Sequence, residues 1–201
     1  WGNGNTVVTH NPAADFGNKL PELFDCILVD APCSGEGMFR KDEGAIAEWS
    51  MKNVQECAER QCDILDDVWD ALKPGGILIY STCTFNREEN EKNAQWIADE
   101  LGAEILPINH NPEWGITEGK PGYHFYPHKT KGEGFYICAF RKRGVATGAF
   151  RIPKQKNSIS ETVEFKDIMQ SWLQHPEQWT IRQQDRFVVA YPAKYKQLIE
   201  F

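Results

Sequence analysis

Two short, continuous apolar runs stand out in the first half of the sequence, at residues 26–29 and 77–80. Both have the length and composition of buried strands. Between them, from an N-cap at Ser50 to about Leu72, apolar residues recur at helical spacing. This stripe comprises Val54, Ala58, Cys62, Leu65, Trp69 and Leu72. Residues 73–76, Lys-Pro-Gly-Gly, then predict the end of the helix and a turn. The pattern predicts a strand–helix–strand unit.

Weaker signals predict the remaining elements. Short strands are expected at residues 6–9, 103–106 and 135–140, and a second helix near Asn86, which has capping-box spacing to Glu89. Residues 144–160 are rich in Gly, Ser, Thr and Lys and have the composition of a linker. Beyond residue 161 we expect a further unit, with a helix near 165–173, a strand near 186–191 and a helix from Ala193.

A cysteine follows each of the two apolar runs. Cys33 lies in Asp30-Ala31-Pro32-Cys33, and Cys83 lies in Ser81-Thr82-Cys83. Parallel strands joined by a crossover helix end at the same edge of a sheet, where open α/β folds bind their ligands. We therefore expect these two thiols to face one pocket. Cys57 and Cys62, on the helix between the strands, are expected to pack in the core.

Composition narrows the class of protein. The chain has 201 residues, of which 41% are hydrophobic and 25% charged. It has no apolar run near the roughly 18 residues that a membrane span needs. The six cysteines form no Cys-x-x-Cys pair and have no His cluster beside them, so we expect no metal site. These features predict a reduced, cytoplasmic globular protein, and the first residue, Trp1, suggests an internal fragment.

Charge is distributed unevenly. The net charge is −7, yet residues 120–160 hold nine basic residues and one acid, Glu133, with aromatic residues between them. Such a band suits RNA, because phosphates attract cations and unstacked bases stack on rings. It equally suits a solvated strand edge that carries protective lysines. Both interpretations stay open, and His124 and His128 within the band are expected to serve packing or the surface.

The two thiols and Asp30 suit one kind of chemistry. A helix N-terminus near Asn86 favours the thiolate of Cys83. Small residues around Cys33 let a substrate approach, and Asp30 can hold a ring nitrogen or an exocyclic amine of a flipped-out base. A thiolate that adds to C6 of a pyrimidine makes C5 nucleophilic enough to take a methyl group from a sulfonium donor. A second group then removes the C5 proton, and the thiol leaves.

These motifs, in this order, resemble the Nop/Sun family of RNA cytosine-5 methyltransferases, most closely its bacterial 16S ribosomal RNA branch. The resemblance extends over about residues 1–142 and rests on four stretches. They are residues 30–37 with Arg40-Lys41-Asp42, residues 73–76, residues 80–84 with 88–91, and residues 132–136. It implies an α/β fold: the C-terminal part of a Rossmann-like S-adenosylmethionine-dependent methyltransferase domain. A linker at 143–160 and the truncated start of a small α+β, RNA-binding-type extension at 161–201 follow.

The resemblance also implies roles for single residues. Cys83 corresponds to the nucleophile, and Cys33 to the cysteine that assists product release. Asp30 corresponds to the residue that contacts the base and lies beside bound S-adenosylmethionine, the methyl donor. Pro32 shapes the same loop. The family's Gly-rich cofactor loop, ribose-binding acid and catalytic lysine correspond to positions upstream of Trp1, so we expect the isolated 201 residues to be inactive.

Two alternatives remain beside an RNA methyltransferase. One is a DNA cytosine-5 methyltransferase, in which Cys33 would attack the base. The other is a non-catalytic RNA-binding fragment. The expected partner is RNA, namely ribosomal RNA by the resemblance, with no membrane and no metal.

Overall fold

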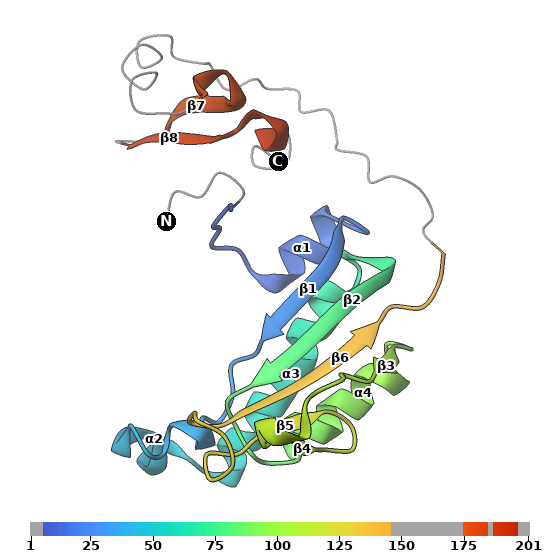
Figure 1. Ribbon diagram of the computed structural model, residues 1–201. Helices are drawn as coiled ribbons and strands as arrows, with labels where there is room; N and C mark the ends of the chain where they lie inside the picture. The colour runs from blue at the N-terminus through green and yellow to red at the C-terminus, as the bar shows by residue number, and fades with distance from the viewer. Residues whose placement is uncertain (1–5, 146–174, 185–186, 197–201) are drawn as a thin grey trace. The chain divides into compact units, whose positions relative to one another are not determined.

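A six-stranded mixed sheet forms the larger part of the computed structural model, which describes residues 6–145, 175–184 and 187–196 (Figure 1). Strands β1 (Phe24–Asp30) and β2 (Leu72–Thr82) are parallel, and β6 (Phe135–Arg141) runs antiparallel to β2. The other edge of β6 pairs with β3 (Glu104–Leu106) and β5 (Tyr123–Phe125). Strand β4 (Thr117–Glu118) pairs with β5.

Helices α1 (Ala13–Lys19), α3 (Met51–Trp69) and α4 (Asn93–Asp99) lie on one face of this sheet (Figure 1). Helix α3 begins as predicted, because the Ser50 hydroxyl accepts a hydrogen bond from the Asn53 N–H. Its buried residues include Val54, Leu65 and Val68. A π-helical turn, η2 (Glu88–Lys92), precedes α4. The crossover from β1 through α3 to β2 is the predicted strand–helix–strand unit.

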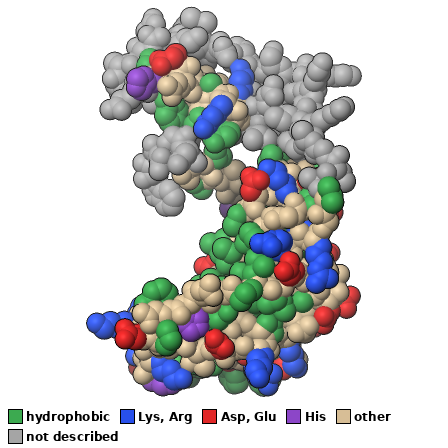
Figure 2. Space-filling model, turned by 45° about the vertical axis from the view of Figure 1, so that its right-hand side comes forward, with side chains coloured by type: hydrophobic (Ala, Val, Ile, Leu, Met, Phe, Trp, Pro, Cys, Tyr) green, Lys and Arg blue, Asp and Glu red, His purple; other side chains and the backbone are tan. Residues whose placement is uncertain are grey.

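The two faces of the sheet differ in burial. Leu78, Tyr80, Cys138 and Phe140 alternate with their neighbours and are almost completely buried. On the other face Leu28 is 62% exposed, and Figure 2 shows hydrophobic side chains gathered on the surface of this part of the molecule. The prediction that the first strand is buried is therefore wrong for β1, where only Val29 is buried. Its hydrophobic composition did not reveal how much of it is covered.

The structure corrects several other expectations. Residues 6–9 form no strand, and Val7 and Val8 are exposed. The predicted turn at 73–76 belongs to β2, where Gly75 has a positive φ and the register with β1 is irregular. The short elements α1, α2 (Glu43–Glu48), β4 and β5 were not predicted, because segments this short give little periodicity.

The chain divides into two compact units, Asn11–Phe150 and a second one made of Trp1–His10 with Arg151–Phe201. In the second unit, β7 (Trp179–Gln184) and β8 (Phe187–Pro192) pair antiparallel, and a 3-10 turn, Ala193–Tyr195, follows. Strand β8 corresponds to the predicted strand near 186–191. The helix expected near 165–173 and most of the linker expected at 143–160 lie outside the described residues, so the boundaries at 142 and 161 stay predictions.

Candidate active site

The carboxyl ends of β1 and β2 bring the two predicted cysteines together. Asp30 is in register with Ser81, and the Ala31 N–H donates to the Ser81 carbonyl, which continues the strand pairing for one more residue. The two chains then turn, and the sulfur atoms of Cys33 and Cys83 lie 2.8 Å apart. Both thiols are free, and the separation exceeds the about 2.05 Å of a disulfide bond. The structure therefore brings the two thiols together as predicted, while the expectation that they face one pocket stays a prediction.

The contact between the two thiols shifts their pKa values in opposite directions. Either sulfur can donate in this contact, and the hydrogen bond with Cys33 is the main cause that lowers the pKa of Cys83 to about 7. The same bond, together with burial, raises the pKa of Cys33 above its usual range. These opposite pKa shifts favour the thiolate at Cys83 and the protonated thiol at Cys33. A thiolate is the nucleophilic form of cysteine.

Asp30 and Pro32 occupy the same edge. One carboxylate oxygen of Asp30 accepts a hydrogen bond from the Ser81 hydroxyl at 2.8 Å, and the residue is exposed. The Pro32 carbonyl accepts a hydrogen bond from the Gln61 side chain of α3, also at 2.8 Å. Ser81 therefore fixes the orientation of the Asp30 carboxylate, while α3 holds the backbone just before Cys33. The structure brings all four predicted site residues to one edge.

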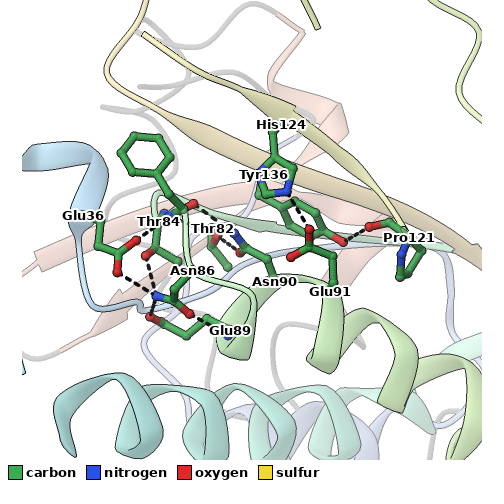
Figure 3. Close-up of polar contacts among 11 residues, drawn as sticks. Glu36, Thr82, Thr84, Asn86, Glu89, Asn90, Glu91, Pro121, His124 and Tyr136 are labelled. Carbon is green, nitrogen blue, oxygen red and sulfur yellow. Dashed lines mark hydrogen bonds and ion pairs between the residues drawn. The ribbon is translucent and has the colours of Figure 1, made fainter. Parts of the chain in front are cut away.

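A buried polar network lies behind the two cysteine loops, and sequence reasoning found only part of it (Figure 3). The predicted cap is present, since the Asn86 side-chain oxygen accepts a hydrogen bond from the Glu89 N–H. The Asn86 amide also donates to Glu36, Thr84 and Glu89. Glu36 accepts a further bond from the Phe85 N–H. The capping-box spacing signalled this helix start, but it gave no sign that the cap reaches the Cys33 loop.

A second, separate contact involves the histidines of the basic band. His124 is 3% exposed, and its Nε2 lies 2.9 Å from a carboxylate oxygen of Glu91 (Figure 3). Its ring also stacks on Tyr126, with centroids 5.0 Å apart. His128 is exposed and stacks on the same tyrosine. His124 therefore has the packing role that we expected, and His128 lies at the surface.

Within the described residues, no group of three or more His, Cys, Asp and Glu side chains is arranged to hold a metal ion. A search of the same residues finds no helix long and apolar enough to cross a membrane. Cys57 and Cys62 donate hydrogen bonds to Asn53 and Asn93, away from the thiol pair.

Comparison with known families identifies the fold and the motifs. The family model described as "16S rRNA methyltransferase RsmB/F" matches residues 2–141. The chain belongs to this family. The predicted family resemblance and the predicted Rossmann-like fold are therefore both confirmed. RsmB/F proteins are S-adenosylmethionine-dependent methyltransferases.

Individual relatives agree with the family. Ribosomal RNA small subunit methyltransferase F of Aliivibrio fischeri is 36% identical over 98% of this chain and 44% of its own length. The protein of the same name from Escherichia fergusonii is 42% identical over 76% of this chain and 32% of its own length. The chain thus spans less than half the length of these RsmB/F relatives.

Solved structures give the same result. A methyltransferase homologue from Pyrococcus horikoshii superposes with a TM-score of 0.55 at 33% identity, over 68% of this chain and 44% of the other. NSun6 from the same organism, solved with the S-adenosylmethionine analogue SFG, gives a TM-score of 0.54 at 27% identity. This superposition covers 68% of this chain and 34% of the NSun6 chain. The sheet and its helices are therefore those of an RsmB/F methyltransferase domain.

Proposed function

We propose that the full-length protein methylates C5 of cytosine in ribosomal RNA, with Cys83 as the nucleophile. The observation that carries this proposal is the thiol pair at the ends of β1 and β2, whose contact lowers the pKa of Cys83. A nucleophile needs a thiolate at working pH, and a pKa of about 7 supplies one. The raised pKa of Cys33 makes it the poorer nucleophile.

The reaction begins with bond formation between the Cys83 sulfur and C6 of cytosine. The sulfur provides the electron pair, and the C5=C6 double bond opens, so that C5 becomes nucleophilic. S-adenosylmethionine supplies the methyl group that C5 accepts. Release then requires loss of the proton on C5, return of the C5=C6 double bond and cleavage of the bond to Cys83.

Cys33 is suited to this second half of the reaction. Its proton is held by the hydrogen bond to Cys83 and by the negative charge there. When the Cys83 sulfur is bonded to C6, it carries no negative charge, and that restraint on the Cys33 proton ends. Cys33 can then lose its proton to solvent and, as a thiolate, take the proton from C5, so that the C5–H electron pair restores the C5=C6 double bond and Cys83 leaves as a thiolate. We therefore assign Cys33 to product release.

Asp30 is the described residue that we expect beside the methyl donor and the base. Its exposed carboxylate fits an amine or ring N–H donor, because Ser81 uses only one of its oxygens. Its position at the carboxyl end of a parallel strand is where α/β sheets bind nucleotide-like ligands. Pro32 shapes the loop between Asp30 and Cys33.

Aromatic side chains close to Cys83 in the structure support RNA as the substrate. Phe85 packs against Tyr126 with ring centroids 5.8 Å apart, and Tyr126 stacks on the exposed His128. Arg40 donates hydrogen bonds to Glu133 and to the Gly132 carbonyl, which ties the loop after Cys33 to these two residues. Exposed rings beside cations bind unstacked bases and phosphates.

The test uses the full-length protein with RNA and S-adenosylmethionine on a denaturing gel. The variant Cys33→Ala is expected to accumulate a covalent protein–RNA adduct, because attack proceeds while release is slow. The variant Cys83→Ala is expected to form no adduct and no 5-methylcytosine. A wild-type arm and a Cys62→Ala arm, which changes a thiol outside the pair, serve as controls.

Other outcomes would contradict the proposal. An adduct only in Cys83→Ala would make Cys33 the nucleophile, as in the DNA-type alternative. No adduct in either variant, with RNA binding retained, would favour a non-catalytic RNA-binding protein. The expected inactivity of the 201 residues alone, the cytoplasmic location and the RNA-binding role of residues 161–201 stay predictions.

A further inference from the structure

Glu89 is a buried carboxylate that contacts the Cys33 loop. It is 0% exposed, and one of its oxygens accepts hydrogen bonds from the Ser34 N–H at 2.9 Å and the Gln61 amide at 2.8 Å. Its other oxygen accepts from the Asn86 amide at 2.7 Å. Three donors match the acceptor-only character of an ionised carboxylate. The Ser34 N–H belongs to the peptide group that directly follows Cys33.

The peptide group before Cys33 is held by the same network. The Gln61 amide that donates to Glu89 also donates to the Pro32 carbonyl. The Gln61 oxygen in turn accepts from the Tyr80 hydroxyl and the Asn93 amide, which fixes the orientation of the Gln61 side chain. Both peptide groups that flank Cys33 are therefore tied to Glu89, one directly and one through Gln61.

Asn90, the next residue along the chain, contacts the residues on either side of Cys83 in the other loop. Its amide donates to the Thr84 carbonyl at 3.0 Å, and its oxygen accepts from the Thr82 hydroxyl. Thr82 and Thr84 flank Cys83. Asn90 is also 0% exposed. An unpaired polar group is costly in such a buried position, so these contacts restrict the Cys83 loop strongly.

Adjacent residues of a helix point in different directions. Glu89 and Asn90 of η2 therefore contact different loops. In Figure 3 the side chain of Glu89 meets Asn86, while that of Asn90 extends towards Thr82 and Thr84. Both residues lie in the π-helical turn Glu88–Lys92. Turns of this kind occur frequently at functional sites.

We propose that Glu89 and Asn90 form a positioning pair that sets the spacing of the two thiols: Glu89 holds Cys33 and Asn90 holds Cys83. The proposal rests on the proposed function for its consequence in catalysis. Neither residue is a catalytic residue, because each acts through the backbone or side chains that flank a cysteine. The division predicts two different defects when the residues are changed one at a time.

The test compares three isosteric variants of the full-length protein. Glu89→Gln replaces the charged acceptor of the Ser34 N–H and the Gln61 amide by a neutral, weaker one, and Asn90→Asp turns an acceptor towards the Thr84 carbonyl. Glu91→Gln is the matched control, since Glu91 lies in the same turn but pairs with His124 of β5. The gel assay above is run as a time course that follows adduct formation and adduct decay separately, with thermal unfolding measured alongside.

The two positioning variants should fail at different steps. Glu89→Gln is expected to slow adduct decay about tenfold and to change adduct formation much less, because Cys33 serves release. Asn90→Asp is expected to slow adduct formation about tenfold. Glu91→Gln should leave both rates within about twofold of wild type. Equal defects in the two variants, or losses that follow the melting temperature in all three, would overturn the proposal.

A second measurement separates this proposal from the proposed function. In a glutathione buffer, oxidised glutathione takes two electrons from Cys33 and Cys83, which yields a disulfide and two molecules of reduced glutathione. The equilibrium constant reports how well the two thiols are held together. We expect it to fall about tenfold in Glu89→Gln and in Asn90→Asp, and to stay unchanged in Glu91→Gln. If the Cys33→Ala protein forms no adduct, the proposed function fails. An unchanged glutathione equilibrium in both positioning variants would refute the positioning pair instead.

Discussion

The two cysteine loops follow parallel strands that differ in how they are packed. Strand β2 lies between β1 and β6, and its Leu78 and Tyr80 are fully buried. Strand β1 is the outermost strand on one side of the sheet, and its Leu28 is largely exposed. Yet the cysteines that follow these two strands, Cys33 and Cys83, are both partly buried. The burial of the two thiols therefore depends on the loops and on the polar network that contacts them. The strands determine only the direction in which the chain enters the site.

The two identical side chains differ in their chemistry. The Cys33 sulfur accepts the Cys83 N–H at 3.3 Å and sits close to Gln61 and Glu89 through its flanking peptide groups. Cys83 has the lower pKa of the two thiols. The same sheet edge therefore offers a reactive thiolate and a proton-holding thiol.

The largest expected effect concerns the packing of the two strands, tested by the free energy of unfolding of one variant in each. Leu78→Ala should cost about 2–5 kcal/mol in the free energy of unfolding, because it opens a cavity in a packed core. Leu28→Ala should cost less than about 1 kcal/mol, since the side chain already faces solvent. Urea unfolding of the 201-residue chain measures both values. Equal costs would show that β1 is as tightly packed as β2.

Glycines in the loop after Cys33 allow a sharper comparison. A Cβ atom at Gly37 would lie 2.6 Å from the Cys83 carbonyl oxygen, which also accepts the Gly37 N–H, whereas one at Gly35 would meet nothing within 4 Å. Gly37→Ala should therefore displace the Cys83 loop and lower methyl transfer by the full-length protein about 100-fold. Gly35→Ala should add only backbone strain of about 1–2 kcal/mol, because its φ is +76°.

Methyl transfer and thermal unfolding, measured on both glycine variants, test this distinction. If Gly35→Ala reduces activity as much as Gly37→Ala, backbone strain in the loop, and not contact with the Cys83 carbonyl, controls the site.

Much of the site followed from local pattern. Two apolar runs, each with a cysteine at its end, sufficed to bring Cys33 and Cys83 together, because the handedness and direction of a crossover unit leave little freedom. The helix caps at Ser50 and Asn86 could also be predicted from the sequence, because capping uses contacts within three residues. These predictions depend on neighbours in sequence or on a general rule of topology.

The remainder depends on contacts that sequence spacing does not encode. Glu89 and Asn90 look like the solvated, acidic first turn of a helix, yet they are buried against loops that lie elsewhere in the sequence. The exposure of Leu28 is a property of what covers β1, and its apolar composition carries no such information. The strands of two or three residues, β4 and β5, take their conformation from pairing with neighbours.

The smallest expected effect isolates the hydrogen bond between the thiols. In the wild type, alkylation of Cys83 by iodoacetamide should rise as the pH increases through about 7, since the thiolate forms above the pKa and is lost below it. Cys33→Ala removes the hydrogen bond that most lowers this pKa, so the midpoint should rise towards the usual thiol value of about 8.5. At pH 7 the alkylation rate should then fall about tenfold.

Mass spectrometry of the alkylated peptides assigns the reaction to Cys83 and provides controls within the molecule. Burial raises the pKa of Cys62 to about 11 and that of Cys138 to about 12, so both should stay unreactive across this range. An unchanged midpoint in Cys33→Ala would mean that Cys33 does not hold the Cys83 thiolate. The assignment of attack to one thiol and release to the other would then lose its electrostatic basis.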